Sequence, residues 1–285
     1  MRKIIILLAS ALIFLGITCR AYTEETVSCQ ECIAVYSDTQ TGHDAHKRIV
    51  ADITKLKPRI VFHLGDMVAR GYKEKDWEKF NVITGELRRS AEFFPVMGNH
   101  ENESPLYFKN FSISKDRPWY SLERFGMYFI VLDTNLPLDW WSKQHRWLQS
   151  ELKSASFGKK PIIVLLHRPL FNIGLHDKDA QGLRQKVVPL FEKYGVVIVF
   201  SGHDHNYQRA LHNGIYYVVS GGGGGGLYSK VSSDPEVLKY NQKFLVVHNF
   251  CTLSYADGEI TVKAYDIDMK FIDEFSEKIS RPAGN

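Results

Sequence analysis

The chain has 285 residues, of which 44% are hydrophobic and 24% charged, the balance of an ordinary soluble globular protein. This length is sufficient for one large domain with a substantial core. The formal net charge is +4, and without residues 1–21 it falls to +1, with 33 basic against 32 acidic residues, so no basic surface implies a nucleic-acid partner.

Residues 1–21 have the pattern of an export signal. Two basic residues, Arg2 and Lys3, precede an apolar run over residues 4–18, and the small residue Ala21 follows shortly afterwards. Because the run is too short to span a bilayer comfortably, we expect a signal peptide, with an N-terminal anchor as the alternative. The sequence therefore predicts an exported protein, periplasmic or extracellular, whose only membrane contact would be this signal or anchor.

Beyond this segment, strand-like and helix-like patterns alternate along the chain. Short apolar runs predict strands at residues 32–37, 59–64, 93–97, 127–132, 162–166 and 196–199. Helices are expected between several of these strands, over about residues 49–56, 75–90, 144–152 and 178–194. The repeated order of strand, helix and strand indicates an α/β fold with a mostly parallel core.

Two regions depart from this alternation. Residues 102–126 are polar and aromatic with little periodicity, and we expect a long surface loop there. Further β segments are expected at residues 216–219, 244–252 and 259–265, which indicate additional antiparallel strands. Since neither an internal repeat nor a linker marks a second domain, residues 22–285 are expected to form one domain.

Polar side chains follow the predicted strands at the points where the strands end. They are Asp38 with Gln40, Asp66, Asn99 with His100, His167, and His203 with His205. Functional side chains gather at the carboxyl ends of strands in α/β sheets, so we expect these residues to meet. Their carboxylate, amide and imidazole groups suit Mn, Fe or Zn, alone or in pairs. A pair of such ions bridged by one carboxylate is a known device for in-line displacement at phosphorus.

These residues stand in blocks that resemble the five motifs of the calcineurin-like metallophosphoesterase superfamily. The blocks are Asp38-Thr39-Gln40, Gly65-Asp66, Gly98-Asn99-His100-Glu101, His167 and Gly202-His203-Asp204-His205. The resemblance spans about residues 32–265, and the glycine run at residues 221–226 is similar to that of the purple acid phosphatase-related branch. It implies a four-layer α-β-β-α sandwich with mixed sheets, in which residues 22–285 form the metallophosphoesterase catalytic domain.

The resemblance also implies a role for each of these residues. The first metal ion would be held by Asp38, Gln40, Asp66 and His205. Asp66 would bridge to a second ion, whose other ligands would be Asn99, His167 and His203. The catalytic residues would be the bridging Asp66 and His100, an acid that protonates the leaving oxygen from outside the metal shell.

Two further positions match substrate-binding residues of relatives. Arg70 matches an arginine that grips phosphate in the protein phosphatases, a task for which the guanidinium fork is well suited. An ordinary surface arginine is the alternative. His176 occupies the place where the related branch has a histidine on the substrate side.

Two positions depart from the family pattern. Where relatives often have a histidine, this chain has Gln40, whose carbonyl binds metal more weakly, and His46 is a competing ligand. Three residues after the bridging aspartate stands Ala69, where the purple enzymes carry a tyrosine and many phosphatases an aspartate that orients the catalytic histidine. We therefore expect no iron-to-tyrosine colour, and either Glu101 or a backbone carbonyl would have to orient His100.

The combined interpretation is a metal-dependent hydrolase of small phosphoesters. A dinuclear centre of divalent or mixed-valence Mn, Fe or Zn would activate a bridging hydroxide for in-line attack, with His100 donating a proton to the leaving group. We expect a phosphomonoesterase. A phosphodiesterase or nucleotide pyrophosphohydrolase on the same scaffold is the first alternative, and a non-catalytic exported binding protein with a degenerate site is the second.

Overall fold

The computed structural model describes residues 32–101, 103–179, 181–232 and 234–279. The predicted signal peptide or anchor at residues 1–21 lies outside these ranges. Among the helices that the structure describes, none is long and apolar enough to cross a membrane.

The first sheet has six strands and combines parallel with antiparallel pairing. Its order is β13 (Phe271–Lys278), β12 (Glu259–Asp266), β11 (Asn249–Ala256), β1 (Ile33–Tyr36), β2 (Ile60–His63) and β3 (Glu92–Pro95). β1, β2 and β3 run parallel to one another, whereas β11, β12 and β13 continue the sheet by antiparallel pairing on the other side of β1. The parallel strands, which come first in the chain, therefore form one half of this sheet.

The second sheet has seven strands and is also mixed. Its order is β10 (Asn241–Leu245), β8 (Tyr207–His212), β9 (Ile215–Ser220), β7 (Val196–Ser201), β6 (Ile162–Leu165), β5 (Met127–Val131) and β4 (Tyr120–Arg124). β5, β6, β7 and β9 run parallel, and antiparallel strands close both edges. The centre of this sheet is thus parallel, as the sequence predicts.

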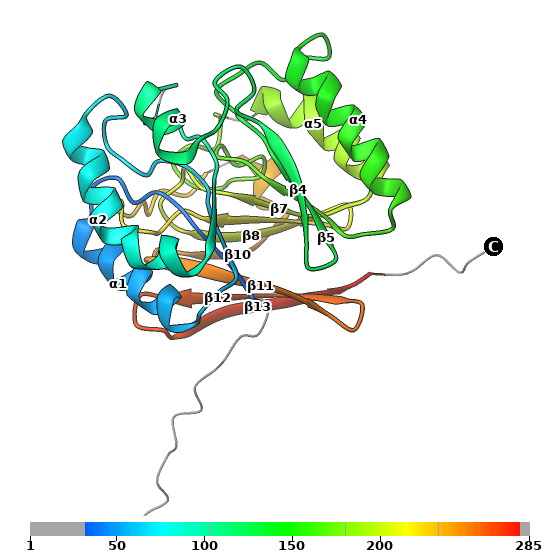
Figure 1. Cartoon of the computed structure of the whole chain (residues 1–285). Coiled ribbons are helices and arrows are strands. Elements are labelled where there is room, and N and C mark those ends of the chain that lie inside the picture. The colour runs from blue at the N-terminus through cyan, green and yellow to red at the C-terminus, as the bar shows by residue number, and fades with distance from the viewer. Residues whose placement is uncertain (1–31, 102, 180, 233, 280–285) are drawn as a thin grey trace, which may run out of the picture.

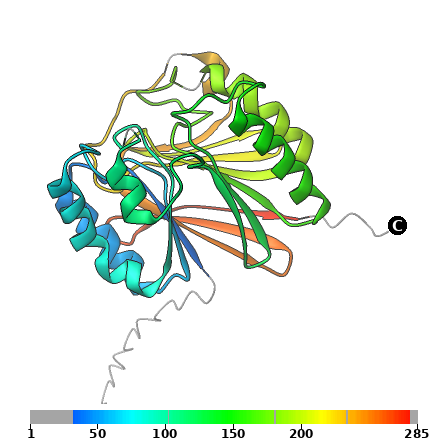
Figure 2. The same cartoon turned by 45° about the horizontal axis from the view of Figure 1, so that its top comes forward.

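In the part of the chain that the structure describes, four longer helices cover the outer faces of the two sheets. α1 (His43–Lys55) and α2 (Glu74–Ser90) pack against the first sheet, and α4 (Lys143–Phe157) and α5 (Gln181–Tyr194) pack against the second. Figure 1 shows the two pairs on opposite sides of the molecule, and Figure 2 shows α4 and α5 side by side. α3 (Pro105–Phe111) and α6 (Pro235–Leu238) are short. The predicted four-layer sandwich with mixed sheets is confirmed.

The layers follow from the alternation of side chains along strands that are apolar on both faces. In β1, Ile33 and Val35 enter the core between the two sheets, whereas Ala34 and Tyr36 enter the core beneath α1 and α2. A strand that is covered on both faces has a continuous apolar run instead of an alternating pattern. This is why the central strands are recognisable in the sequence.

The expectation of a long surface loop over residues 102–126 is wrong. This segment contains α3 and β4. The Ser104 hydroxyl caps α3 by accepting the N–H of Leu106 at 3.1 Å, and Pro105 stands at the first turn. β4 pairs with β5 through a tight turn at Phe125 and Gly126, both with positive φ. Because β4 is only partly buried, it has no apolar run to reveal it.

The β segments after residue 200 are also more numerous than expected. The strand predicted at 244–252 is in fact the end of β10 and the beginning of β11, and β8 and β13 have no counterpart among the predicted strands. These strands extend the antiparallel parts of the two sheets.

Phe129 and Phe157 offer a matched test of the central core. Phe129 is fully buried between the sheets, whereas Phe157 is 76% exposed at the end of α4. We expect Phe129→Ala to lower the free energy of unfolding by about 3–5 kcal/mol, because a cavity adds to the lost burial. We expect Phe157→Ala to change it by no more than about 0.5 kcal/mol. Denaturant unfolding measures both, and equal losses would contradict this position of the core.

Candidate metal centre

The carboxyl ends of parallel strands from both sheets carry the predicted ligands. Asp38 follows β1, Asp66 follows β2, Asn99 follows β3, His167 follows β6, and His203 and His205 follow β7. The two edges are joined directly, because Nδ1 of His167 lies 2.8 Å from the backbone oxygen of Leu64, which follows β2. The site therefore lies where the carboxyl ends of the parallel strands in the two sheets meet.

One group of donor atoms matches the predicted ligands of the second metal ion. Nε2 of His167 lies 3.0 Å from Oδ1 of Asn99 and 3.4 Å from Oδ2 of Asp66. A ring nitrogen of His203 lies within 4.8 Å of donor atoms of Asp66 and His167. The structure thus brings these four predicted residues together.

A second group matches the predicted ligands of the first ion. Nε2 of His205 lies 3.6 Å from Oδ1 of Asp38 and 3.1 Å from the side-chain nitrogen of Gln40. Within the described structure, Oδ1 of Asp38 and Oε1 of Gln40 are buried without a hydrogen-bond partner. Burying an oxygen atom without a hydrogen-bond partner costs free energy, and both carboxylate and amide oxygens can bind a cation instead. These residues therefore fit a metal ion.

His46, the competing candidate for the position of Gln40, packs into an aromatic cluster. Its ring centroid lies 6.0 Å from that of Tyr36 and 5.8 Å from that of Phe80. Burial lowers the pKa of His46 to about 3, so its ring is neutral at neutral pH. The structure brings the side chain of Gln40 into contact with His205.

Each of the two carboxylates is anchored by one oxygen and offers the other to the site. Oδ2 of Asp38 accepts the backbone N–H of His203 at 2.9 Å and the hydroxyl of Ser37, which leaves Oδ1 facing His205. Oδ1 of Asp66 accepts the backbone N–H of His100 at 2.9 Å, which leaves Oδ2 facing His167. The backbone of one motif therefore orients the carboxylate of another.

The backbone at the strand ends is adapted to these contacts. Asp38, Asp66 and His203 have φ values of 59°, 55° and 71°, a left-handed conformation that is uncommon outside glycine and concentrates at functional sites. A Cβ on Gly98 would lie 2.2 Å from Oδ1 of Asp66, and one on Gly202 would lie 2.5 Å from Oδ2 of Asp38. Only glycine fits so close to these carboxylates.

The glycine run at residues 221–226 packs against the same site. The N–H groups of Gly223 and Gly225 donate to the backbone oxygens of Ser37 and Asp38 at 2.8 and 2.6 Å. A Cβ on Gly225 would lie 2.6 Å from a ring carbon of His205. The glycine run therefore allows the backbone to pack closely against the site, and it does not behave as a spacer.

Within this site, a protonated histidine offsets the negative charge. Burial raises the pKa of Asp38, and His167 opposes this effect. Burial alone would lower the pKa of His167, but the Asp66 and Asp38 carboxylates outweigh it and raise this pKa to about 9. Burial lowers the pKa of His203 to about 3 and that of His205 to about 4, so both rings offer a lone pair at neutral pH. A cation would replace the proton of His167.

His100 stands beside these groups with its side chain 38% exposed. Its Nδ1 lies 2.9 Å from the backbone oxygen of Ala69, and its Nε2 lies 3.8 Å from Oδ2 of Asp66. Of the two orienting groups that the sequence suggests for His100, the structure shows the backbone carbonyl. Nε2 is therefore the ring nitrogen that faces the site.

Glu101 has a different task, which sequence reasoning missed. Its buried carboxylate accepts the backbone N–H groups of Asp66, Met67 and Gly98 at 2.9, 2.8 and 2.8 Å. Burial, with the nearby Asp66, raises the pKa of Glu101 to about 7. This side chain ties the turn after β2 to the turn after β3.

The two predicted substrate-binding residues differ in their surroundings. The guanidinium of Arg70 is exposed and donates two hydrogen bonds of 2.9 Å to Asp76. The ring of His176 lies 4.4 Å from that of His203, centroid to centroid, at the edge of the site. The structure therefore brings His176 to a predicted metal ligand, His203, and holds Arg70 in an ion pair.

Two neighbours of the histidines were not foreseen from the sequence. The ring of Tyr228 stacks on His205, with centroids 4.2 Å apart and planes inclined by 10°. The carboxylate of Asp179 lies 2.8 Å from Nε2 of His203. Tyr228 follows the glycine run without any motif to mark it, whereas the position of Asp179, three residues after His176, is a signal that could have been used.

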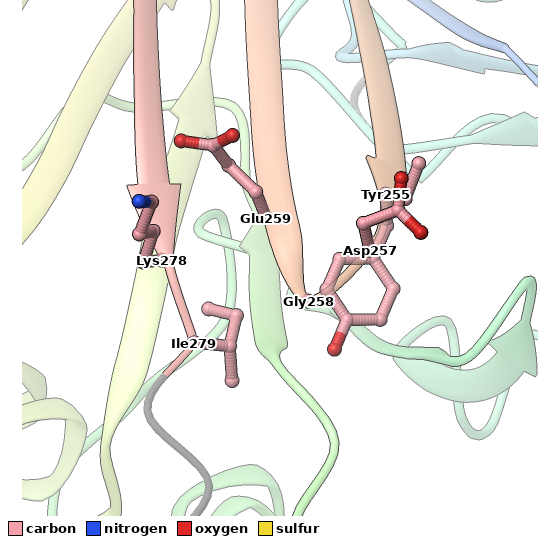
Figure 3. A pocket seen from close by; sticks show the side chains of 7 residues that line it. Tyr255, Asp257, Gly258, Glu259, Lys278 and Ile279 are labelled. Carbon is pink, nitrogen blue, oxygen red and sulfur yellow. The ribbon is translucent and has the colours of Figure 1, made fainter.

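A hollow elsewhere on the molecule does not adjoin this site. It lies at the turn between β11 and β12 and includes Tyr255, Glu259 and Lys278 (Figure 3). The antiparallel register of β1 with β11 puts this turn beyond the amino end of β1, whereas Asp38 follows the carboxyl end. The hollow is thus at the opposite edge of the first sheet.

Comparisons with known proteins agree with the fold and the motifs. A family model described as calcineurin-like phosphoesterase matches residues 33–207, more than half of the chain. Purple acid phosphatase 18 of Arabidopsis thaliana is 28% identical over 186 residues, which cover 60% of this chain and 42% of that protein. Fe(3+)-Zn(2+) purple acid phosphatase 12 of the same plant is 29% identical over 178 residues, covering 54% and 38%.

A solved structure shows the same fold over most of the chain. It is that of purple acid phosphatase PPD1 from seeds of yellow lupin, Lupinus luteus, with a TM-score of 0.75 at 18% sequence identity. The match covers 90% of this chain and 57% of the lupin chain. The chain therefore spans only about half of the length of these relatives or less.

Glu101→Gln tests the tie between the two turns. A glutamine has one acceptor oxygen in place of two and turns an amide N–H₂ toward backbone donors, so buried N–H groups lose their partner. We expect the free energy of unfolding to fall by roughly 1–3 kcal/mol. Glu103→Gln, at an exposed position nearby, is the matched control and should change it by no more than about 0.5 kcal/mol. Chemical denaturation decides the matter, and indistinguishable variants would refute this role of Glu101.

Proposed function

The chain belongs to the calcineurin-like phosphoesterase family, and we propose that it hydrolyses small phosphomonoesters at a two-metal centre. The relatives named above support this assignment by their names as phosphatases. The proposal concerns the reaction and the class of substrate, and it involves no nucleic-acid partner.

One observation carries the proposal more than any other. Two groups of metal-binding atoms lie side by side in one buried site, and each contains a carboxylate with one oxygen anchored and the other directed into the site. The oxygen that each carboxylate directs into the site faces an imidazole nitrogen, of His167 for Asp66 and of His205 for Asp38. Oxygen and nitrogen donors grouped in this way suit a pair of cations, which would take the place of the proton on His167.

The residues divide between the two ions as follows. Asp38, Gln40 and His205 would hold one ion, Asn99, His167 and His203 would hold the other, and Asp66 would bridge them. When bound, the pair would neutralise charge on the phosphoryl oxygens and lower the pKa of a water molecule, which supplies the nucleophile. The mixture of oxygen and nitrogen ligands favours Mn, Fe or Zn. Because Ala69 has no phenolate, we expect no iron-to-tyrosine colour.

His100 would act as the general acid. With Nδ1 committed to the backbone oxygen of Ala69, the exchangeable proton of the catalytic step is the one on Nε2. Oδ2 of Asp66 lies 3.8 Å from the same nitrogen. A proton passed from Nε2 to the ester oxygen would make the alcohol a better leaving group.

The substrate contacts are assigned as follows. His176, beside His203 at the partly exposed edge, would donate to a phosphoryl oxygen. Arg70 now donates from Nε and Nη2 to Asp76, and it would grip a phosphate with the same two nitrogens if the phosphate replaced Asp76. We also propose export of the protein, on the basis of the signal-like pattern of residues 1–21.

A phosphodiesterase or nucleotide pyrophosphohydrolase is the second candidate function. The residue that favours it is Gln40, because relatives that cleave nucleotide diphosphate bonds also have glutamine at this position. In this chain the side chain of Gln40 contacts His205. Substrate preference distinguishes the two candidates.

A panel of esters tests the proposed reaction. The full chain should hydrolyse an aryl phosphomonoester with a higher kcat/KM than the matching aryl phosphodiester, lose activity after treatment with a chelator, and recover it with Mn²⁺, Fe²⁺ or Zn²⁺. A preference for the diester or for a nucleotide pyrophosphate would replace the first candidate with the second. Metal-loaded protein without activity on any ester would support a binding protein instead.

His100→Ala tests the general acid. For an alkyl ester, whose leaving group needs a proton, we expect kcat to fall by about 10²–10⁴-fold, and for an ester of an acidic phenol much less. Bound metal, measured by elemental analysis, should not change. His212→Ala is the matched control, because His212 ends β8 at the edge remote from the site and should not affect rate. An equal loss for both esters would argue against proton donation by His100.

A further inference from the structure

A carboxylate outside the predicted ligand set contacts one of the metal-binding histidines. Oδ2 of Asp179 lies 2.8 Å from Nε2 of His203, 3.3 Å from Nη1 of Arg168 and 3.4 Å from Nδ1 of His176. The side chain of His203 is only 7% exposed, whereas that of Asp179 is 35% exposed. Asp179 thus closes the outer side of a nearly buried ring.

His203 belongs to two groups of possible ligand atoms. A donor nitrogen of this ring lies within 4.8 Å of donor atoms of Asp66 and His167, and a donor nitrogen also lies within 4.8 Å of donor atoms of Asp179 and His176. In a neutral imidazole one nitrogen carries hydrogen and the other a lone pair. A carboxylate at 2.8 Å from Nε2 selects the form with hydrogen on Nε2, which leaves the lone pair on Nδ1.

We propose that Asp179 is the positioning residue of His203: it holds the hydrogen on Nε2, fixes the ring and directs Nδ1 to the second metal ion. The proposal rests on the two-metal centre proposed above. Its physical basis is general, because a carboxylate on the remote nitrogen of a metal-binding imidazole sets the tautomer and strengthens the ligand. Asp179 would therefore control the metal affinity of one of the two sites and leave the other unchanged.

Neighbouring charges make this role specific to Asp179. Nη1 of Arg168 donates to the same oxygen, and Nδ1 of His176 lies 3.4 Å from it, so both help to hold the carboxylate in position. Asp177, two residues earlier, instead accepts the hydroxyl of Ser232. Asp177 therefore serves as a matched control that carries the same charge on the same loop.

Metal binding by the full chain, without any assay of activity, tests the proposal. The protein is stripped with a chelator and titrated with Zn²⁺ in competition with a chromophoric chelator. We expect Asp179→Ala to weaken one of two binding steps by about 10–100-fold and to leave the other step unchanged. Asp179→Asn keeps an acceptor oxygen and should lose less, and Asp177→Ala should bind both ions as the wild type does.

The outcomes separate this proposal from its alternatives. Equal binding by Asp179→Ala and Asp177→Ala would overturn it and leave the proposed function standing. Complete loss of one ion in Asp179→Asn would overturn it by identifying Asp179 as a direct ligand. Wild-type protein that binds no Zn²⁺ would instead refute the two-metal centre itself.

The hydrogen position can be measured independently. Nitrogen-15 spectra of the labelled full chain, with metal removed, report which nitrogen of His203 carries hydrogen. We expect the hydrogen on Nε2 in the wild type and in Asp177→Ala, and a shift toward the other form in Asp179→Ala. Hydrogen on Nδ1 in the wild type would contradict the proposal even if a substituted protein failed to fold.

Discussion

The site depends on two buried carboxylates that are each anchored through one oxygen. Oδ2 of Asp38 is fixed by the backbone N–H of His203, and Oδ1 of Asp66 by the backbone N–H of His100. Buried negative charge is costly unless a positive partner compensates it. The fold supplies one such partner, the His167 ring, whose pKa the carboxylates raise to about 9 despite its burial. Among the described residues, Oδ1 of Asp38 has no hydrogen-bond partner, so it is available to bind a cation at the strand ends.

Much of this arrangement could be predicted from the sequence, for a physical reason. Strands covered on both faces are continuous apolar runs, and the carboxyl ends of parallel strands share an edge, so the residues that follow such runs must meet. Ile33–Tyr36 and Ile60–His63 are examples, and Asp38 and Asp66 follow them. The antiparallel strands are harder to predict from the sequence. In β13, Asp273 lies on the buried face, where it accepts hydrogen bonds from Tyr207 and Arg209, and it disrupts the apolar alternation.

Contacts made by the backbone and by distant side chains can be predicted only in part. The carbonyl of Ala69 faces His100 whatever side chain the residue carries, so a departure from the family pattern at this position leaves the orientation of His100 intact. Asp179, between β6 and α5, contacts His203, and only its spacing of three residues from His176 indicates this in the sequence. In the same way, Asp76 engages Arg70 through an ion pair that no motif announces. Sequence patterns identify ligands better than they identify the groups that orient them.

The central claim is that these strand ends hold two metal ions that share Asp66. A crystal structure of the protein grown with Mn²⁺, with anomalous diffraction to locate the metal, tests this most directly. The account predicts two anomalous peaks about 3.5–4 Å apart, one beside Asp38 and His205 and the other beside Asn99 and His167. An intact site without a peak, or with a single peak that does not contact Asp66, would contradict it.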